Sequence, residues 1–478
     1  MILGWAWLAT SQEQVAVQYT WPFLRTSEII TLAEFTSSTA EQSDLYQRIG
    51  NLIRGDWRFN RQGPQDLLAF EENRVFVYAL GDATEAADNS QPSHRSGRNS
   101  GWLRRFIFLK PSTFVVDDEI KTPASKKPVR WWLYSHNEPE IVGSVARFTE
   151  REVELLCETL LPKNAVQQSA HQPRGRGPGD EYLLNVVPQG SPGGSRFLHV
   201  LHARRPGDQS SVARAELITQ NSQLRLTITT PQCIFRLTLP PAQVSAGDIT
   251  VSKSDGTDLL VRRPLPSGIL PHGPEGVKML DSWDDSYRGG KRPSWDAGRP
   301  SGELQRVVEK GIVSACRAVD LGCGLGTDAI YLAGKGFNVT AIDIAPTALS
   351  RAEEKARQAG VKVRWLLADV LAAPKLGPFD FIFDRGCYHE VRINNAKAYV
   401  ETVRRLSRPG ARFLLLAGNP NELPLQYAPP QVAEEDIRSD FSSLFDLEWL
   451  RETRFETINP SIKGPLAWSV MLRRKGKP

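Results

Sequence analysis

The sequence predicts a multidomain chain in which an all-β sandwich or barrel is followed by a doubly wound α/β domain. The chain has 478 residues, which is enough for several domains of ordinary size. Up to about residue 265, short runs rich in β-branched and aromatic residues alternate with clusters of Gly, Pro, Ser and Asn. Beyond that point strand-like and helix-like segments alternate, which is typical of a parallel sheet covered by helices on both faces.

The composition argues against several classes of protein. Hydrophobic residues make up 40% of the chain and charged residues 24%, which argues against a disordered or fibrous protein. A net charge of +5 spread over this length predicts neither a nucleic-acid nor a membrane partner. No run approaches the roughly 18 consecutive apolar residues that a membrane-spanning helix needs.

The cysteines and the first residues predict a cytoplasmic protein. The five cysteines are odd in number and none lies in a CxxC motif, so we expect neither a disulfide framework nor a metal site. The opening run MILGWAWLA is apolar, but it has no basic leader and no small-residue cleavage site. We therefore expect a buried strand there rather than a signal peptide.

The first 265 residues contain the runs that predict an all-β domain. Strands are expected at Arg74–Leu80, Leu103–Lys110, Thr113–Ile120, Val129–Tyr134, Phe197–Ala203, Ala215–Thr219, Leu224–Thr230 and Ile234–Leu239. Residues 266–280 are rich in proline and glycine, which is typical of a linker. The predicted domains are therefore 1–265 and 281–478, joined by the linker 266–280.

The second domain shows the alternation of a doubly wound fold. Helices are expected at Leu304–Ala315, Asp328–Lys335, Ala348–Ala359 and Ala396–Leu406. Strands are expected at Val319–Leu321, Asn338–Ile342, Val363–Leu367, Phe379–Phe383 and Ala411–Leu416, with a closing pair at Asp446–Phe455 and Ala467–Arg474.

A glycine-rich turn lies between the first strand and the next helix of this domain. Its glycines allow the backbone to turn sharply and approach a ligand, at which the following helix points its amide groups. Gly324-x-Gly326-x-x-Ala329 fits a dinucleotide-binding turn, whereas Asp320-x-Gly322-x-Gly324-x-Gly326 fits the turn of enzymes that use S-adenosylmethionine. The carboxylate of Asp320 favours the second cofactor, because it suits an α-ammonium group and is poorly placed beside a pyrophosphate.

A second carboxylate supports a nucleoside at this turn without choosing between the two cofactors. Asp343 ends the next strand, about 20 residues after the turn, where an acidic side chain accepts the ribose hydroxyls. We expect Asp343 and the adjoining Ile344 to contact the cofactor.

These motifs resemble, in order and over residues 281–478, those of class I S-adenosylmethionine-dependent methyltransferases, with the thiopurine methyltransferase-like group most similar. The turn VDLGCGLG, the strand end at Asp343, the run LLADV and the segment SWDAGRP (294–300) carry the resemblance. It implies a Rossmann-like, seven-stranded sheet with an antiparallel last strand. It also implies that Asp369 and Val370 contact the adenine, and that the acceptor is a small or medium-sized molecule with a heteroatom nucleophile.

The remaining candidates concern the transfer itself, in which holding the nucleophile and the methyl group close matters more than a strong base. Trp295 is the candidate to cover the cofactor and attract its sulfonium, or else to anchor a surface segment. Asp384, in a loop that follows a strand, is a candidate to orient substrate, and His389 is a candidate base. For both, a hydrogen bond that stabilises the loop is the alternative.

The first domain carries a weaker resemblance. The runs YALGDATEAA, WLRRFIFLKPSTFVVDDEI and VRWWLYSHNEPEI resemble the β-sandwich domain of heparinase II/III-like polysaccharide lyases. That family also has a helical toroid, for which we expect no counterpart in this sequence, although Tyr134, His136 and Arg130 are conceivable lyase residues. The alternative functions are therefore a lyase or a carbohydrate-binding protein that takes an acidic polysaccharide as its partner.

Overall fold

The computed structural model forms two compact units and describes most of the chain. The described residues are 24–25, 29, 67–82, 101–121, 129–150, 152–172, 181–189, 195–208, 213–220, 223–242, 245–290, 292–374, 376–422 and 429–476. The first unit comprises residues 1–68, 73–217 and 228–232, and the second comprises residues 69–72, 218–227 and 233–478. The strand expected at the start of the chain lies outside the described residues.

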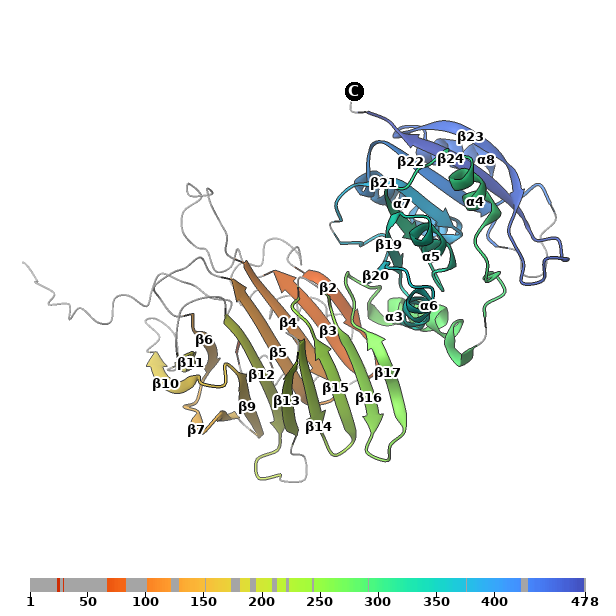
Figure 1. Ribbon diagram of the computed structural model, residues 1–478. Coiled ribbons are helices and arrows are strands. Elements are labelled where there is room, and N and C mark those ends of the chain that lie inside the picture. The colour runs from red at the N-terminus through yellow and green to blue at the C-terminus, as the bar shows by residue number, and fades with distance from the viewer. Residues whose placement is uncertain are drawn as a thin grey trace, which may run out of the picture. The chain divides into compact units, whose positions relative to one another are not determined.

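The largest sheet of the N-terminal region has eight strands (Figure 1). They are β2 (Leu67–Glu72), β3 (Phe76–Asp82), β4 (Gly101–Leu109), β5 (Thr113–Lys121), β7 (Glu140–Val142), β8 (Val145–Glu150), β9 (Val153–Leu161) and β12 (Ser195–Arg204). Their order is β2-β3-β4-β5-β12-β9-β8-β7. Most buried side chains of this sheet are apolar, but it also contains buried ion pairs, among them Arg104–Asp118 and Arg105–Asp117.

A smaller sheet packs against β5 and β12. Its strands are β1 (Leu24–Arg25), β6 (Trp131–Ser135), β10 (Val166–Gln172) and β11 (Glu181–Val187), in the order β1-β6-β11-β10. The indole of Trp131 donates to the carboxylate of Asp118 at 2.9 Å and stacks on His199, with 3.7 Å between ring centroids. Trp131 therefore fastens β6 to the larger sheet.

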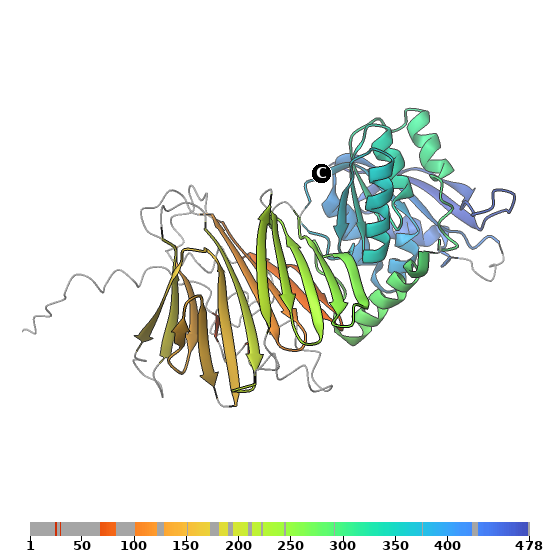
Figure 2. The ribbon, with the colours of Figure 1, turned by 60° about the horizontal axis from the view of Figure 1, so that its bottom comes forward.

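Five further strands form a third sheet, drawn in yellow-green to green in Figure 2. They are β13 (Arg214–Gln220), β14 (Gln223–Thr229), β15 (Cys233–Leu239), β16 (Asp248–Lys253) and β17 (Asp258–Pro264), in sequence order across the sheet. Along β14 every second side chain is buried, as expected for a strand with one face on a core. The N-terminal region is thus rich in strands, as predicted.

The C-terminal region is built on a seven-stranded sheet. Its strands are β18 (Arg317–Leu321), β19 (Asn338–Asp343), β20 (Arg364–Leu367), β21 (Phe379–Arg385), β22 (Ser407–Gly418), β23 (Phe445–Arg454) and β24 (Leu466–Arg474). Their order is β20-β19-β18-β21-β22-β24-β23, with β24 antiparallel to both of its neighbours. The carboxyl ends of the parallel strands therefore lie at one edge, where doubly wound folds bind ligands.

Helices cover both faces of this sheet. They are α3 (Gly273–Asp285), α4 (Gly302–Glu309), α5 (Thr327–Gly334), α6 (Pro346–Gln358), α7 (Cys387–Leu406) and α8 (Glu434–Phe441). Residues from α4 and α5 pack with Ala318 of β18, whereas residues from α7 and α8 pack with the adjacent Val319. Because neighbouring residues of a strand point to opposite faces, the two groups of helices cover opposite faces.

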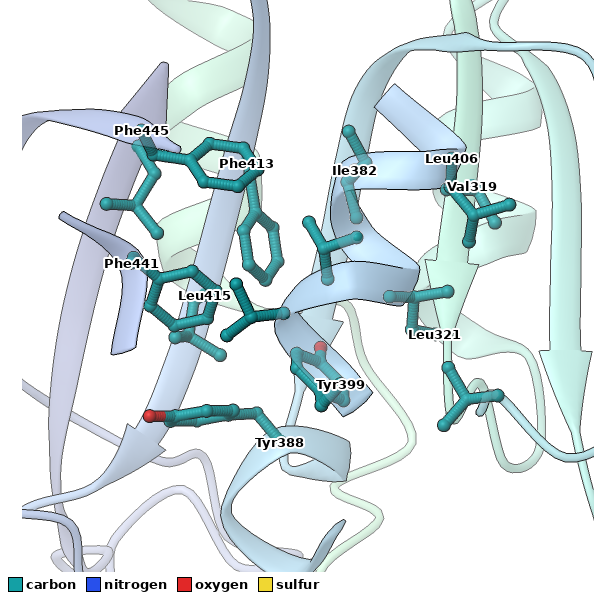
Figure 3. Packing of buried hydrophobic residues seen from close by; sticks show 14 of the residues in the cluster. Val319, Leu321, Ile382, Tyr388, Tyr399, Leu406, Phe413, Leu415, Phe441 and Phe445 are labelled. Carbon is teal, nitrogen blue, oxygen red and sulfur yellow. The ribbon is translucent and has the colours of Figure 1, made fainter. Parts of the chain in front are cut away.

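The larger core of the C-terminal region lies under α7 and α8. Figure 3 shows Tyr388 and Tyr399 of α7 with Phe413 and Leu415 of β22 and Phe441 of α8. All five side chains are buried. Burying an aromatic or aliphatic side chain of this size contributes roughly 1.5–3 kcal/mol, so this cluster is a major source of stability for the carboxyl edge of the sheet.

Two helices differ from what the sequence predicts. Helix α7 begins at Cys387 rather than at the expected Ala396, and Asp384 lies at the end of β21 rather than in the expected loop. The helix starts early because the carboxylate of Asp384 accepts hydrogen bonds from its first amides. Helix α3 begins at Gly273, inside the expected linker 266–280, with a proline in its first turn. None of the helices in the described ranges combines the length and apolarity that a membrane crossing requires.

Candidate functional site

The glycine-rich turn joins the end of β18 to the start of α5. Gly322, Gly324 and Gly326 all have positive φ angles, of 67°, 51° and 71°, a conformation that glycine adopts at little cost. A Cβ at Gly322 would lie 2.6 Å from the Cβ of Cys387, and one at Gly326 would lie 2.5 Å from the ring of Trp365. Both the backbone conformation and the neighbours therefore require glycine at this turn.

Asp320 ends β18 next to this turn, and its side chain is only 3% exposed. Its Oδ2 atom is buried and has no hydrogen-bond partner among the described residues. Burial raises the pKa of this carboxyl well above its usual range, and the carboxylates of Asp328, Asp384 and Asp343 raise it further. A buried carboxylate of this kind is stabilised by a cationic ligand. The α-ammonium of S-adenosylmethionine fits this requirement, and the glycine turn leaves room for the backbone to approach the cofactor.

Asp343 ends β19 and organises the same turn. Its Oδ2 accepts a hydrogen bond from the amide of Gly324 at 2.7 Å, and its Oδ1 accepts one from the amide of Ala345 at 2.8 Å. Burial raises the pKa of Asp343, although these amide contacts lower it. The structure thus brings Asp343 against the glycine turn.

Further charged groups lie around Asp320 that the sequence analysis did not identify. Asp328, in the first turn of α5, accepts the amide of Ser301 at 2.7 Å, and burial raises its pKa to about 6. Arg385 acts on both Asp320 and Asp328 and lowers the pKa of each. The sequence offered one indication of a role for Asp328. It lies two residues after Gly326, at the start of the expected helix, where an acidic side chain is stabilised. Acidic side chains therefore outnumber basic ones around Asp320.

The residues expected at the adenine follow β20. Asp369 is partly buried, its Oδ1 accepts the amide of Leu371 at 2.8 Å, and burial raises its pKa. Val370 is 5% exposed and belongs to the apolar core. Ile344 packs against an apolar cluster that includes Leu367 at the end of β20. The amide of Ala368 donates to the carbonyl of Asp343 at 3.0 Å, which ties the two strand ends together.

A segment rich in aromatic residues lies at the glycine turn. The hydroxyl of Tyr287 lies 3.1 Å from where a Cβ of Gly324 would be, so this ring borders the turn directly. The indole of Trp295 donates to the same hydroxyl at 3.3 Å, and its ring lies edge-on to both Tyr287 and Trp283. Arg385 donates to the carbonyl of Trp295 at 3.0 Å and pairs with Glu456 at 3.3 Å. Trp295 itself is 45% exposed.

Asp384 is fully buried and already has several hydrogen-bond donors. Its carboxylate accepts the amides of Cys387 and Tyr388 at 2.9 and 3.0 Å, together with the hydroxyl of Tyr399. Burial raises its pKa to about 7, whereas these donors lower it. The geometry favours the alternative that the sequence left open, in which Asp384 stabilises the start of α7.

His389 is also committed to a structural contact. The amide of Gly418 donates to its Nδ1 atom at 3.2 Å, so the neutral ring carries its proton on Nε2. Burial lowers the pKa of His389 to about 4, and the nearby Arg385 adds to that effect. At neutral pH the ring is therefore uncharged and its accepting nitrogen is occupied, which again favours the structural alternative over a general base.

We expect His389→Asn to leave methyl transfer largely intact. Because a true general base contributes about 100-fold or more to the rate, kcat/KM between pH 6 and 8 should fall by less than about threefold. The measurement is kcat/KM against pH, with His136→Asn as the control at an exposed histidine. A loss of about 100-fold together with a changed pH profile would restore His389 as the base.

Two cysteines adjoin the turn. Cys323 follows Gly322, and Cys387 lies beneath it. Burial raises the pKa of both thiols well above the usual range, and the surrounding carboxylates raise it further. Both side chains are therefore protonated thiols at neutral pH.

The candidates of the N-terminal region are placed differently. His136 follows β6, is half exposed, and has its Nδ1 atom 3.7 Å from the carboxylate of Glu150. Arg130 is exposed just before β6, and Tyr134 lies on that strand, partly buried. His136 thus has a local ionic neighbour. Within the described residues no group of three or more His, Cys, Asp or Glu side chains is arranged to hold a metal ion.

Comparisons with known proteins place this site in context. A family model described as a methyltransferase domain matches residues 318–410, which contain the glycine turn, Asp343, Asp369 and Asp384. A 2-heptyl-1-hydroxyquinolin-4(1H)-one methyltransferase from Mycobacteroides abscessus is 28% identical over 185 residues, covering 37% of this chain and 81% of the relative. A probable thiol methyltransferase from Arabidopsis thaliana is 28% identical over 28% of this chain and 60% of its own length. A solved structure from work on the conversion of a disulfide bond into a thioacetal group during echinomycin biosynthesis is 29% identical. It covers 41% of this chain and 92% of its own, with a TM-score of 0.37.

Proposed function

Because the C-terminal region is a class I S-adenosylmethionine-dependent methyltransferase domain, we propose that this enzyme methylates a heteroatom of a small-molecule acceptor. The observation that carries the proposal is the buried Asp320 carboxylate, whose Oδ2 has no partner in the described structure. The acidic side chains around it would be stabilised in their ionised form by the α-ammonium and the sulfonium of a bound cofactor.

In this proposal, different residues around the turn contact different parts of the cofactor. Asp320 holds the α-ammonium, and Gly322, Gly324 and Gly326 allow the backbone to approach the methionine part. Asp343 accepts the ribose hydroxyls, with Ile344 beside it. These contacts are supported by the Gly324–Asp343 hydrogen bond, which holds the two motifs at one place.

The residues after β20 and the aromatic segment contact the rest of the cofactor in this proposal. We propose that Asp369 accepts the adenine amino group and that the amide of Val370 contacts the ring. Trp295 covers the cofactor, where its ring face adds about 0.5–2 kcal/mol of attraction for a sulfonium. The edge-on packing of Trp295 on Tyr287, which borders the glycine turn, supports this placement.

The bound cofactor supplies a methyl group already activated by positive sulfur. The protein then has to hold the acceptor in line with that group, exclude water and orient the nucleophile, which contributes more than proton transfer does. Thiols, halides and acidic hydroxyls need no strong base, and the committed contacts of His389 and Asp384 are consistent with such acceptors. The names of the two methyltransferase relatives favour an S- or O-methyl product.

The proposal is tested by transfer of labelled methyl from S-adenosylmethionine to a panel of thiols, halides, N-hydroxy heteroaromatics, amines and oligosaccharides. We expect transfer to at least one of the first three classes, and calorimetry should show binding of S-adenosylhomocysteine. Failure with every acceptor, together with no cofactor binding, would remove the function.

Four finer proposals rest on the sequence. Membership of the thiopurine methyltransferase-like group is supported by Trp283, Tyr287 and Trp295 meeting at one cluster. The ancestry of the first domain in a lyase sandwich is supported by the contacts of Trp131 between two sheets. Incubation with acidic polysaccharides, followed by absorbance of unsaturated products, tests whether that domain has such an activity. The domain boundary at residue 265 and the cytoplasmic location also stay predictions.

A further inference from the structure

The segment Ser267–Leu270 lies in the region whose composition predicts a linker, yet it pairs with the end of β20. The amide of Ser267 donates to the carbonyl of Leu367 at 2.9 Å, and the amide of Asp369 donates to the carbonyl of Ile269 at 3.2 Å. Strand β20 is the outermost strand of the seven-stranded sheet, so its outer edge would otherwise present unpaired backbone groups. The segment satisfies that edge where the proposed adenine-binding residues begin.

The opposite edge of the segment pairs with Phe70. The amide of Phe70 donates to the carbonyl of Gly268 at 3.2 Å, and the amide of Leu270 donates to the carbonyl of Phe70 at 2.9 Å. Phe70 and Ile269 thereby form a parallel bridge. Ser267 and Ile269 thus bond to the end of β20, whereas Gly268 and Leu270 bond to Phe70. This alternation is the pattern of a strand that is hydrogen-bonded on both sides.

The side chains around the segment are also closely packed. Gly268 is buried, and a Cβ there would lie 2.7 Å from the Cβ of Ala368 and 3.1 Å from the Cδ of Pro374. Leu270 is buried in a cluster with Leu367, against which Ile344 also packs. Because packed interiors have little free volume, a displacement of the segment is transmitted to residues 367–370.

We propose that the segment Ser267–Leu270, braced by Phe70, is a positioning element for the adenine end of the cofactor site. It holds the backbone at Asp369 through the Ile269 carbonyl, and the contact of Gly268 with Ala368 sets how closely the two chains approach. The inference rests on the proposed function, because it assumes that Asp369 and Val370 contact the adenine. Cofactor recognition then depends on Phe70, about 300 residues from Asp369 in the sequence.

The test is Gly268→Ala in the full chain. Gly268 does not have a positive φ angle, so the added methyl group acts through its contacts with Ala368 and Pro374 alone. The matched control is Gly334→Ala at the end of α5, where a Cβ would meet nothing within 4 Å. Calorimetry would compare S-adenosylhomocysteine with S-inosylhomocysteine, which lacks the adenine amino group.

We expect Gly268→Ala to weaken binding of S-adenosylhomocysteine by about tenfold, since small misplacements in a binding site have effects of this size or larger. Binding of S-inosylhomocysteine should change little, so the preference for adenine would be lost, and KM for the acceptor should not change. Phe70→Ala should shift the preference in the same direction and by less. Thermal unfolding of each variant would check that it folds.

The outcomes separate the inference from the function on which it rests. If the unmodified protein binds neither nucleoside, the proposed function fails. If it binds them and Gly268→Ala keeps both affinity and preference, the positioning role is overturned. An equal loss of affinity for both compounds would also overturn it, because that result describes general destabilisation. If Gly268→Ala does not fold, an unchanged adenine preference in Phe70→Ala overturns the inference.

Discussion

Asp320→Asn should abolish most cofactor binding while making the empty protein more stable. The variant removes the charge that would pair with the α-ammonium of the cofactor. Leaving one member of a buried ion pair alone costs about 3–5 kcal/mol, so we expect the Kd of S-adenosylhomocysteine to rise by about 100-fold or more. Calorimetry measures this directly, with Asp285→Asn as the control at an exposed aspartate of α3.

The stability of the same variant should move in the opposite direction. Folding raises the pKa of Asp320, so the folded protein holds a proton that the unfolded chain releases near pH 4. The folded state therefore loses stability as the pH rises from about 4 toward the raised pKa. Asparagine does not titrate, so the ligand-free variant should melt above the wild type at pH 7, with a smaller difference at pH 4.

Thermal unfolding at the two pH values, with and without S-adenosylhomocysteine, checks this prediction. Each kcal/mol should shift the melting temperature by roughly 2–4 °C for a domain of this size. A variant that melts below the wild type at pH 7 without ligand would show that the Asp320 carboxylate is already compensated by the protein. In that case the Asp320 carboxylate would not need a cationic ligand.

Asp343→Ala should weaken cofactor binding by about tenfold or more, because charge-assisted hydrogen bonds to the ribose are roughly twice as strong as neutral ones. The variant also removes the acceptor for the amides of Gly324 and Ala345, which adds a loss of stability of about 1–3 kcal/mol for each buried group left unpaired. Calorimetry with S-adenosylhomocysteine measures the first effect, and thermal unfolding measures the second.

A ribose analogue separates the two roles of Asp343. The wild type should prefer S-adenosylhomocysteine to its 2′-deoxy analogue, and Asp343→Ala should bind the two alike. Asp343→Asn, which keeps an acceptor for one amide, should recover stability more than affinity. Unchanged affinity in Asp343→Ala would remove the ribose assignment.

The sequence allowed the glycine turn and its carboxylates to be predicted because their signal is local. Gly322, Gly324 and Gly326 lie within five residues, and their positive φ angles are a property of the turn itself. Asp343 ends the next strand of a parallel sheet, so the topology alone brings it to the same edge.

The features that could not be predicted depend on partners far apart in the chain. The start of α7 depends on the Asp384 carboxylate, which is held in place by Tyr399 from the next part of the helix. The segment at Gly268 has the composition of a linker, yet its pairing comes from Phe70 and from Leu367 on separate elements. The composition of a segment indicates how flexible it would be in isolation. Contacts with neighbouring elements then decide whether it becomes ordered.

The two thiols beside the turn bear on how the enzyme avoids reacting with itself. Thiolates are strong nucleophiles toward an alkyl sulfonium, whereas neutral thiols react slowly. Burial keeps Cys323 and Cys387 protonated, and the carboxylates that would attract the cofactor add to that effect. The same carboxylates would thus help to bind the cofactor. They would also help to keep the nearest sulfur atoms from reacting with it before an acceptor arrives.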